Sequence, residues 1–344
     1  MSPPRNFPRH EAIVLVTVTL LAIAVGTINR EFFSFFNIFS LLKNSTIIGL
    51  FAVGFFLVLV VGGLDVSFTS IGVVGMYGTV KLALAFYPGA PFVILFVVAA
   101  LIGTALGLIN GLLVTRLQAP SLIVTLGTLS LYRGFLLYFI GTKWIREVPT
   151  AMVEFNRTNV LVMTAANGAK VGLHISVAIF LAIVAIVFLV LRYTTLGRSL
   201  YAVGGNPVAA RRMGINVEAV QTLAYCMAGT LASIAGFLSA VRLRLADPQS
   251  LTGSELDVIA AAVIGGAAIT GGKGSVIGVF LGVLLIVITN DSLIVLGIPA
   301  AWQKVAIGVL LLVAIGMPLL ARGRFTASQV RTGGGLVRVG GGSA

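Results

Sequence analysis

The sequence predicts an all-α membrane protein that crosses the bilayer about ten times. Three observations point to this class. Of its 344 residues, 58% are apolar or aromatic and only 10% are charged, whereas a soluble domain has about 25% charged residues. Apolar stretches of about 20 residues, the length that a helix needs to cross hydrocarbon, recur along the chain. The polar interruptions between them are mostly short.

The expected crossings are, in order, 12–28, 45–63, 67–86, 92–114, 121–140, 173–191, 220–241, 258–270, 276–289 and 302–320. Two of them, 258–270 and 276–289, are short and rich in glycine, so they are open to a re-entrant or strongly tilted arrangement, and a count of about nine to eleven stays open. The first apolar run continues past a possible signal cleavage site at 22–24, which favours a retained membrane anchor.

The formal charge of +13 is read as an orientation signal, because so few charges are present in all. With a cytoplasmic N-terminus, the inner connections hold more Lys and Arg than the outer ones, which hold most of the acids. Ten crossings then place both termini in the cytoplasm. The expected organisation is an N-terminus at 1–11, a membrane domain at 12–320 with an inner loop at 192–219, and a disordered tail at 321–344.

The inner loop has the sequence signals of a short helix. Asn206 suits the N-cap, Pro207 suits the first helical position, and Gly214 suits the stop. A helix of about seven residues is too short to be stable alone, which favours docking on a cytoplasmic subunit; an ordinary positively charged inner loop is the alternative. The residues expected at this contact are Gly204, Gly205, Asn206, Pro207, Arg211, Arg212 and Gly214.

Two polar breaks, at 62–71 and 246–257, interrupt the apolar pattern. Because an ionised Asp facing lipid costs about 2.5–3.5 kcal/mol, Asp65 is expected to face protein, water or the interface. Broken helices in corresponding positions of two halves are typical of inverted repeats around a transport path. The alternative is that both breaks are loops with capping residues. The candidate path residues are Asp65, Ser67, Asn110, Thr125, Arg133, Glu255 and Asp257.

The glycine-rich segment 265–276 contains Gly-Lys-Gly-Ser but departs from the phosphate-binding loop, in which the lysine is followed directly by Ser or Thr. A tight inner turn with close helix packing is the better interpretation. With one cysteine and two histidines, the chain offers no metal site and no catalytic group of residues, and nothing in it suggests nucleotide or nucleic-acid binding. No catalytic residue is expected.

Several ordered motifs together resemble the membrane permeases of bacterial ATP-binding-cassette importers for monosaccharides, the ribose-type family. The resemblance covers about residues 30–320, and the segments 125–134, 141–149 and 298–302 are most similar to permeases of autoinducer-2 import systems, with rhamnose permeases close. The motifs that carry the resemblance are 62–67, 107–111, 120–134, 204–207, 214–215, 253–260 and 265–266.

The resemblance implies a permease subunit in the cell (inner) membrane that passes a sugar-like solute to the cytoplasm. It implies a cytoplasmic ATPase that binds ATP, a second permease subunit of the same or another kind, and a periplasmic or lipid-anchored solute-binding protein, with no cofactor in this chain. Segment 206–214 matches the family's coupling segment, whereas the Arg- and Gly-rich tail has no counterpart. The alternative class is a secondary transporter driven by an ion gradient, for which only Asp65 and Asp257 are candidate coupling groups.

Overall fold

The computed structural model describes residues 7–164, 170–299 and 301–312. Within them, eight helices are long and apolar enough to cross a membrane, which confirms the predicted all-α polytopic class. These helices are α1 (Phe7–Ile28), α2 (Phe35–Val60), α3 (Phe68–Phe86), α4 (Phe92–Leu117), α5 (Ser121–Phe135) with its continuation η2 (Leu136–Ile140), α7 (Ile175–Tyr193), α10 (Val217–Leu243) and α12 (Val276–Val295).

Shorter elements fill the connections. They are η1 (Arg30–Phe33), α6 (Thr150–Phe155), the antiparallel hairpin β1 (Asn159–Thr164) and β2 (Lys170–His174), α8 (Thr195–Gly205), α9 (Pro207–Arg212), α11 (Glu255–Ile264) and an apolar helix Ala301–Leu312. The hairpin and α6 lie between the expected crossings 121–140 and 173–191, and β2 takes up the first two residues of the second of these crossings.

Some predicted boundaries are wrong. Helix α2 begins ten residues before the expected start at residue 45, because Ser34 caps it by accepting a hydrogen bond from the backbone of Asn37 (3.3 Å). The expected crossing 258–270 is the 10-residue helix α11, too short to span alone. Of the crossing 302–320, the structure describes the residues up to 312; the remainder and the expected tail 321–344 lie outside the described residues, as does most of the N-terminal segment 1–11.

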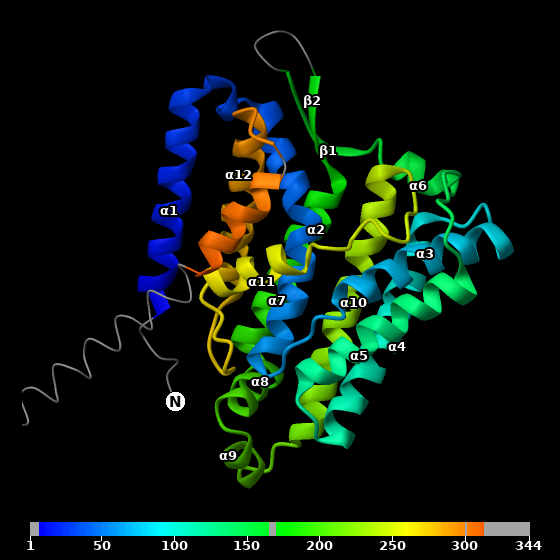
Figure 1. Cartoon of the computed structure of the whole chain (residues 1–344), viewed down its shortest axis with the longest axis vertical. Helices are drawn as coiled ribbons and strands as arrows, with labels where there is room; N and C mark the ends of the chain where they lie inside the picture. Colours follow the sequence, from blue (N-terminus) through cyan, green and yellow to red (C-terminus); the bar gives the residue numbers. More distant parts are fainter. Residues whose placement is uncertain (1–6, 165–169, 300, 313–344) are drawn as a thin grey trace, which may run out of the picture.

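Helices α2, α3 and α10 form the centre of the bundle (Figure 1). Their apolar windows are 78–83% buried, against 22% for α1 and α4 at the periphery. Helix α10 packs on α3 and α4, and α2 packs on α11 and α12, while α3 contacts α4 and α11 contacts α12. In this reciprocal packing α10 meets the helices that follow α2, and α2 meets the helices that follow α10; the inverted repeats stay a prediction.

Small residues bring the central helices into backbone contact. Along α4, Gly103, Gly107 and Gly111 recur every fourth residue and face α10. A Cβ atom at Gly107 would lie 2.3 Å from the carbonyl oxygen of Tyr225 on α10, which leaves no room for any side chain. Close approach through small residues is the usual packing mode of membrane helices.

The glycine-rich segment 265–275 is a tight turn between α11 and α12, as the sequence predicted. Its glycines adopt positive φ at four positions, and a Cβ at Gly265 would lie 2.4 Å from the carbonyl oxygen of Gly278 on α12. The start of α1 braces this turn: His10 Nε2 lies 3.1 Å from the carbonyl oxygen of Ile264, and Ser275 donates a hydrogen bond to Glu11. The segment is therefore a structural turn, held from outside as well as by its own glycines.

Candidate functional site

The first polar break begins where α2 ends. Gly62 has a φ of +84°, and the amide of Gly63 donates to the carbonyl oxygen of Val58 (3.0 Å). This is a Schellman stop, in which glycine takes the left-handed conformation that closes a helix. The chain then runs without helical hydrogen bonds through residues 64–66 before α3 starts at Phe68. Backbone polar groups in such a segment need partners from elsewhere when the segment lies inside a membrane bundle.

The start of α5 supplies those partners. The amide of Leu64 donates to Ser121 Oγ (2.8 Å), and Thr125 Oγ1 donates to the carbonyl oxygen of Leu64 (3.1 Å). Thr125 Oγ1 also accepts from the amide of Val66 (3.3 Å). Thr125, a predicted path residue, therefore holds the broken backbone in place.

A buried side-chain network continues from the break to α4 and α5. Asp65 Oδ1 accepts from both the amide (2.8 Å) and the hydroxyl (2.6 Å) of Ser67. Asn110 Nδ2 donates to Ser67 Oγ (2.7 Å), and Tyr132 donates to Asn110 Oδ1 (2.9 Å). All four residues are at most 4% exposed. The polar groups of Asp65, Ser67 and Asn110 thus face each other, although Asp65 Oδ2 has no hydrogen-bond partner within the part of the chain that the structure describes.

The second break leads into α11. Ser254 and Ser67 both occupy N-cap positions, yet neither side chain caps its helix; Ser254 Oγ donates to the carbonyl oxygen of Leu251 instead (2.7 Å). Asp257, in the first turn of α11, accepts from Lys304 Nζ at 2.9 and 3.1 Å. This ion pair joins α11 to the helix Ala301–Leu312, so Asp257 has a structural partner.

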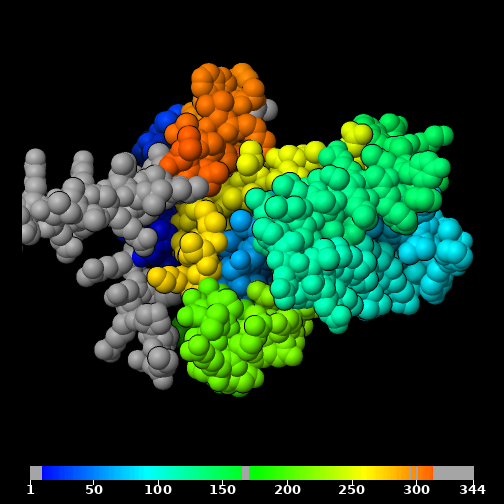
Figure 2. All heavy atoms as spheres, turned by 60° about the horizontal axis from the view of Figure 1, so that its bottom comes forward, coloured from blue at the N-terminus to red at the C-terminus, as the bar shows by residue number. Residues whose placement is uncertain are grey.

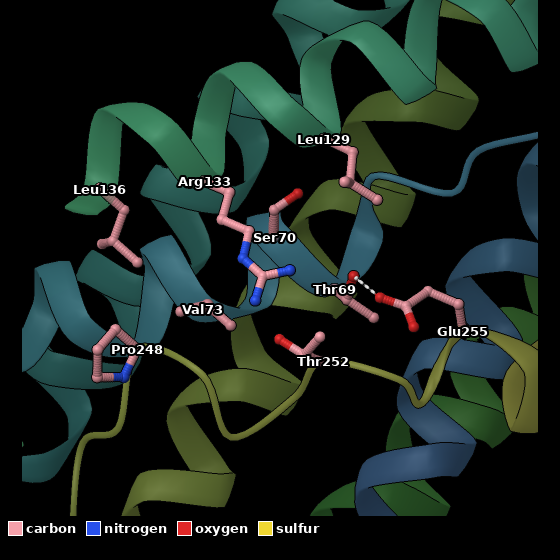
Figure 3. A pocket seen from close by; sticks show the side chains of 9 residues that line it. All are labelled: Thr69, Ser70, Val73, Leu129, Arg133, Leu136, Pro248, Thr252 and Glu255. Atoms are coloured by element: carbon pink, nitrogen blue, oxygen red, sulfur yellow. Dashed lines mark hydrogen bonds between the residues drawn. The ribbon is translucent and has the colours of Figure 1, made fainter. Parts of the chain in front are cut away.

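Helices α3 and α11, which follow the two breaks, meet at their N-terminal ends. Thr69, in the first turn of α3, donates to Oε1 of Glu255, the first residue of α11 (2.7 Å; Figure 3). Arg133 extends from α5 toward the start of α3 and the second break. Among the described residues Arg133 and Glu255 form no ion pair, so both charged groups keep free hydrogen-bonding capacity.

A small cavity lies at this meeting point. Its volume is about 20 Å³, room for a water molecule. The cavity is lined by Thr69, Ser70, Val73, Leu129, Arg133, Leu136, Pro248, Thr252 and Glu255. Hydroxyl groups and opposite charges therefore converge here from α3, α5 and the second break.

The structure divides the predicted path residues into three groups. Arg133 and Glu255 line the cavity, and Asp257 pairs with a lysine. The other four, Asp65, Ser67, Asn110 and Thr125, belong to the buried network around the first break. The sequence reasoning missed Thr69, Ser70 and Thr252 as cavity residues and Ser121 and Tyr132 as network residues. The first three lie inside the polar breaks that the sequence showed, so their position was the available signal.

A second candidate site lies at the end of the bundle that carries α8 and α9. Asn206 caps α9 by accepting from the amide of Ala209 (3.0 Å), Pro207 occupies the first turn, and Gly214 takes a φ of +82° after the helix. The predicted short helix is confirmed in each of these three features. Helix α8, which precedes it and ends with Gly204 and Gly205, was not predicted.

Helix α9 and its stop present an exposed mixed surface. Val208 is 61% exposed and Met213 is 68% exposed. Arg211 pairs with Glu218, whereas Arg212 forms no ion pair with any described residue. Figure 2 shows the light-green segment that contains α8 and α9 as a protruding lobe beside the yellow turn 265–275. Exposed apolar groups with an arginine that has no ion-pair partner are typical of a docking surface.

The comparisons decide the family. The family model described as "Branched-chain amino acid transport system / permease component" matches residues 37–315. The chain belongs to this permease family. The permease is 33% identical over 308 residues to the autoinducer 2 import system permease protein LsrC of Escherichia coli (strain K12 / DH10B), covering 89% of this chain and 86% of that protein.

Other relatives agree. The LsrC protein of Yersinia pseudotuberculosis serotype IB (strain PB1/+) is 33% identical over 304 residues, which cover 88% of this chain and 83% of that protein. No solved structure matches the permease. With eight apolar helices in its described part, the permease is a multi-pass membrane protein that serves as a transport component. Across the same described residues, no group of three or more His, Cys, Asp or Glu could hold a metal ion.

Proposed function

We propose that the permease is the membrane subunit of an ATP-binding-cassette importer that passes a sugar-like solute, autoinducer 2 or a relative such as rhamnose, into the cytoplasm. ATP binds to a separate cytoplasmic ATPase and not to this chain, a binding protein delivers the solute, and a second permease subunit completes the membrane unit. Helix α9 carries this proposal. It is a capped helix that ends in two basic residues and, with the residue that follows it, exposes Val208 and Met213.

In this proposal α9 is the coupling segment and faces the cytoplasm. The termini of the chain lie on that same side. Arg211 is held by Glu218 and stiffens the link from α9 to α10. Val208, Arg212 and Met213 then form the contact surface toward the ATPase, because they are exposed and their side chains form no hydrogen bond or ion pair within the described residues.

The cavity between α3, α5 and the second break is the proposed solute path. A sugar-like solute carries several hydroxyls, each both donor and acceptor. Thr69, Ser70 and Thr252 match that chemistry, and Arg133 and Glu255 add a strong donor and a strong acceptor. Sites at the ends of broken helices between two repeats are usual in transporters. At about 20 Å³ the cavity is closed to a sugar, so α5 must move away from the second break during transport.

Reconstitution in proteoliposomes with the cognate ATPase and binding protein tests the coupling role. The double variant Arg212→Glu/Met213→Glu is expected to lower solute-stimulated ATPase activity about tenfold, equivalent to about 1.4 kcal/mol of lost contact. Arg198→Glu, which reverses one arginine at an exposed position of α8, is the control and should keep activity within about twofold. Uptake that proceeds without the ATPase and collapses with the ion gradient would overturn the proposal in favour of a secondary transporter.

A separate experiment tests the path. Arg133→Gln and Glu255→Gln are expected to raise the KM of uptake and leave ATPase activity without solute unchanged, because they alter solute contacts and not the ATPase contact. Arg146→Gln, in the loop that follows η2, is the matched control. Uptake assays with autoinducer 2, rhamnose and ribose identify the solute. An unchanged KM for every transported solute in both cavity variants would refute the path.

A further inference from the structure

Three glycine-containing segments that are far apart in the sequence meet at one point. They are the end of α2 at Gly62, the end of α8 at Gly204, and the α11–α12 turn at Gly271 and Gly272. We call these four residues the glycine junction. A backbone hydrogen bond fastens it, from the amide of Gly272 to the carbonyl oxygen of Val60 in α2 (2.9 Å).

The contacts in the glycine junction are between backbones. A Cβ atom at Gly204 would lie 1.8 Å from the carbonyl oxygen of Val60 and 2.7 Å from the amide nitrogen of Gly272. A Cβ at Gly271 would lie 2.7 Å from the Cα of Gly62. No flexible side chain lies between the three segments to absorb a displacement. Closely packed elements move between discrete arrangements and do not deform continuously, so these segments are expected to move together.

Each segment of the junction leads to a different part of the molecule. Gly204 is two residues from Asn206, the cap of α9. Gly62 opens the first break, which leads into α3 and Thr69. The turn containing Gly271 joins α11, which begins at Glu255, to α12. The junction therefore lies between the exposed helix α9 and the helices α3 and α11, which border the cavity.

A second contact links α8 to the same turn. Tyr201 on α8 donates a hydrogen bond to the carbonyl oxygen of Gly274 (2.9 Å). Burial raises the pKa of Tyr201 to about 12, with the nearby Glu11 adding to the shift, so the hydroxyl stays a donor at physiological pH. Helix α8 and the turn are thus joined at two positions on opposite sides of Lys273.

We propose that Gly204 is a positioning residue for transport: the glycine junction passes a displacement of α9 to α3 and α11 at once, opening or closing the cavity from both sides. This inference rests on the proposed coupling role of α9. It adds that coupling depends on the absence of a side chain at Gly204, where a Cβ would lie 1.8 Å from the carbonyl oxygen of Val60.

Gly204→Ala tests this, with Gly127→Ala as its control. Gly127 lies in α5, and its Cβ would meet nothing within 4 Å, so alanine there adds a side chain without a contact. In the assembled complex, Gly204→Ala is expected to lower the stimulation of ATPase activity by solute-loaded binding protein by about fivefold or more. This is within the usual range of allosteric coupling, about 5- to 150-fold. Copurification of the ATPase subunit should persist. Gly127→Ala should behave as the unsubstituted permease.

A cross-link covers the case in which Gly204→Ala fails to assemble. A cleavable bismaleimide between Tyr201→Cys and Lys273→Cys, with Cys226 replaced by Ala, fixes α8 to the turn. If the two move as one body, stimulation and uptake should be the same before and after cleavage. The inference is overturned if stimulation and uptake are low in the cross-linked complex and return on cleavage. It is also overturned if the Gly204→Ala complex assembles and its ATPase activity is fully stimulated.

The two proposals fail in different ways. If the unsubstituted complex shows no stimulation of ATPase activity by solute-loaded binding protein, the proposed importer function itself is wrong. If the unsubstituted complex is stimulated and Gly204→Ala is stimulated equally, the importer function stands and the role of Gly204 is wrong.

Discussion

Ser67→Ala tests the buried network that supports the first break. The hydroxyl of Ser67 donates to Asp65 Oδ1 (2.6 Å) and accepts from Asn110 Nδ2 (2.7 Å). Alanine removes both bonds. It leaves a buried amide nitrogen without its acceptor and a buried carboxylate with one hydrogen bond fewer. Ser70→Ala is the matched control in the same helix, because Ser70 donates only to the carbonyl oxygen of Ser67, which also accepts from the amide of Ile71.

The two variants should differ clearly in the free energy of unfolding. A single hydrogen bond inside a membrane bundle contributes about 0.6 kcal/mol, which is the loss expected for Ser70→Ala. A buried polar group left without its partner costs about 1–3 kcal/mol. With two such groups affected and at most 1% exposed, Ser67→Ala should lose about 2–4 kcal/mol.

Equilibrium unfolding in mixed detergent micelles measures both values, with ATPase copurification as a check on assembly. The reasoning would be refuted by equal losses in the two variants, because the network would then carry no more energy than one local bond. A loss in Ser67→Ala that disappears when Asn110 is also changed to Ala would show that the unpaired amide was the dominant cost.

Three further predictions concern stability in the same assay. Lys304→Met should destabilise by leaving Asp257 buried without its cation, and the added change Asp257→Asn should restore most of the loss; no recovery would show that the ion pair is not the cause. Burial lowers the pKa of His174 from its ordinary value of 6.5, so its contribution to stability is complete above pH 6.5 and falls as the pH drops below it. His174→Gln should flatten this dependence of the free energy of unfolding on pH, and an unchanged dependence would contradict the prediction. Gly107→Ala should destabilise, because its Cβ would lie 2.3 Å from a backbone oxygen, whereas Gly127→Ala, with nothing within 4 Å, should not; equal effects would argue against backbone contact between α4 and α10.

The membrane fold was predictable from the sequence because its signals are local. Apolar length identifies a crossing, and the cap, proline and stop around Asn206, Pro207 and Gly214 identify a short helix within a few residues. Where the sequence erred, the signal was weak or mixed. The start of α2 carries Lys43 and Asn44 inside the helix, so an apolar window begins too late, although Ser34 marks the true start.

The site was less predictable because the role of a polar residue in a membrane segment depends on the residues that it bonds to. Asp65 and Glu255 looked equivalent, each an acid in a polar break. Oδ1 of Asp65 accepts from Ser67, two residues away, and Ser67 accepts from Asn110, 43 positions away. Glu255 bonds to Thr69, 186 positions away. A local sequence pattern cannot show which residues so far apart in the sequence bond to each other.

The difference between the two breaks has a mechanical consequence. Around the first break, side chains of α4 and α5 form hydrogen bonds to its backbone and to Ser67, so these bonds are preserved when α4, α5 and the first break move as a unit. The second break has no such support from α5, and Arg133 crosses the gap to it without forming an ion pair. Separation of α5 from the second break therefore breaks no strong interaction, whereas separation of α5 from the first break breaks several. The cavity should open on the side of the second break, between Arg133 and Thr252.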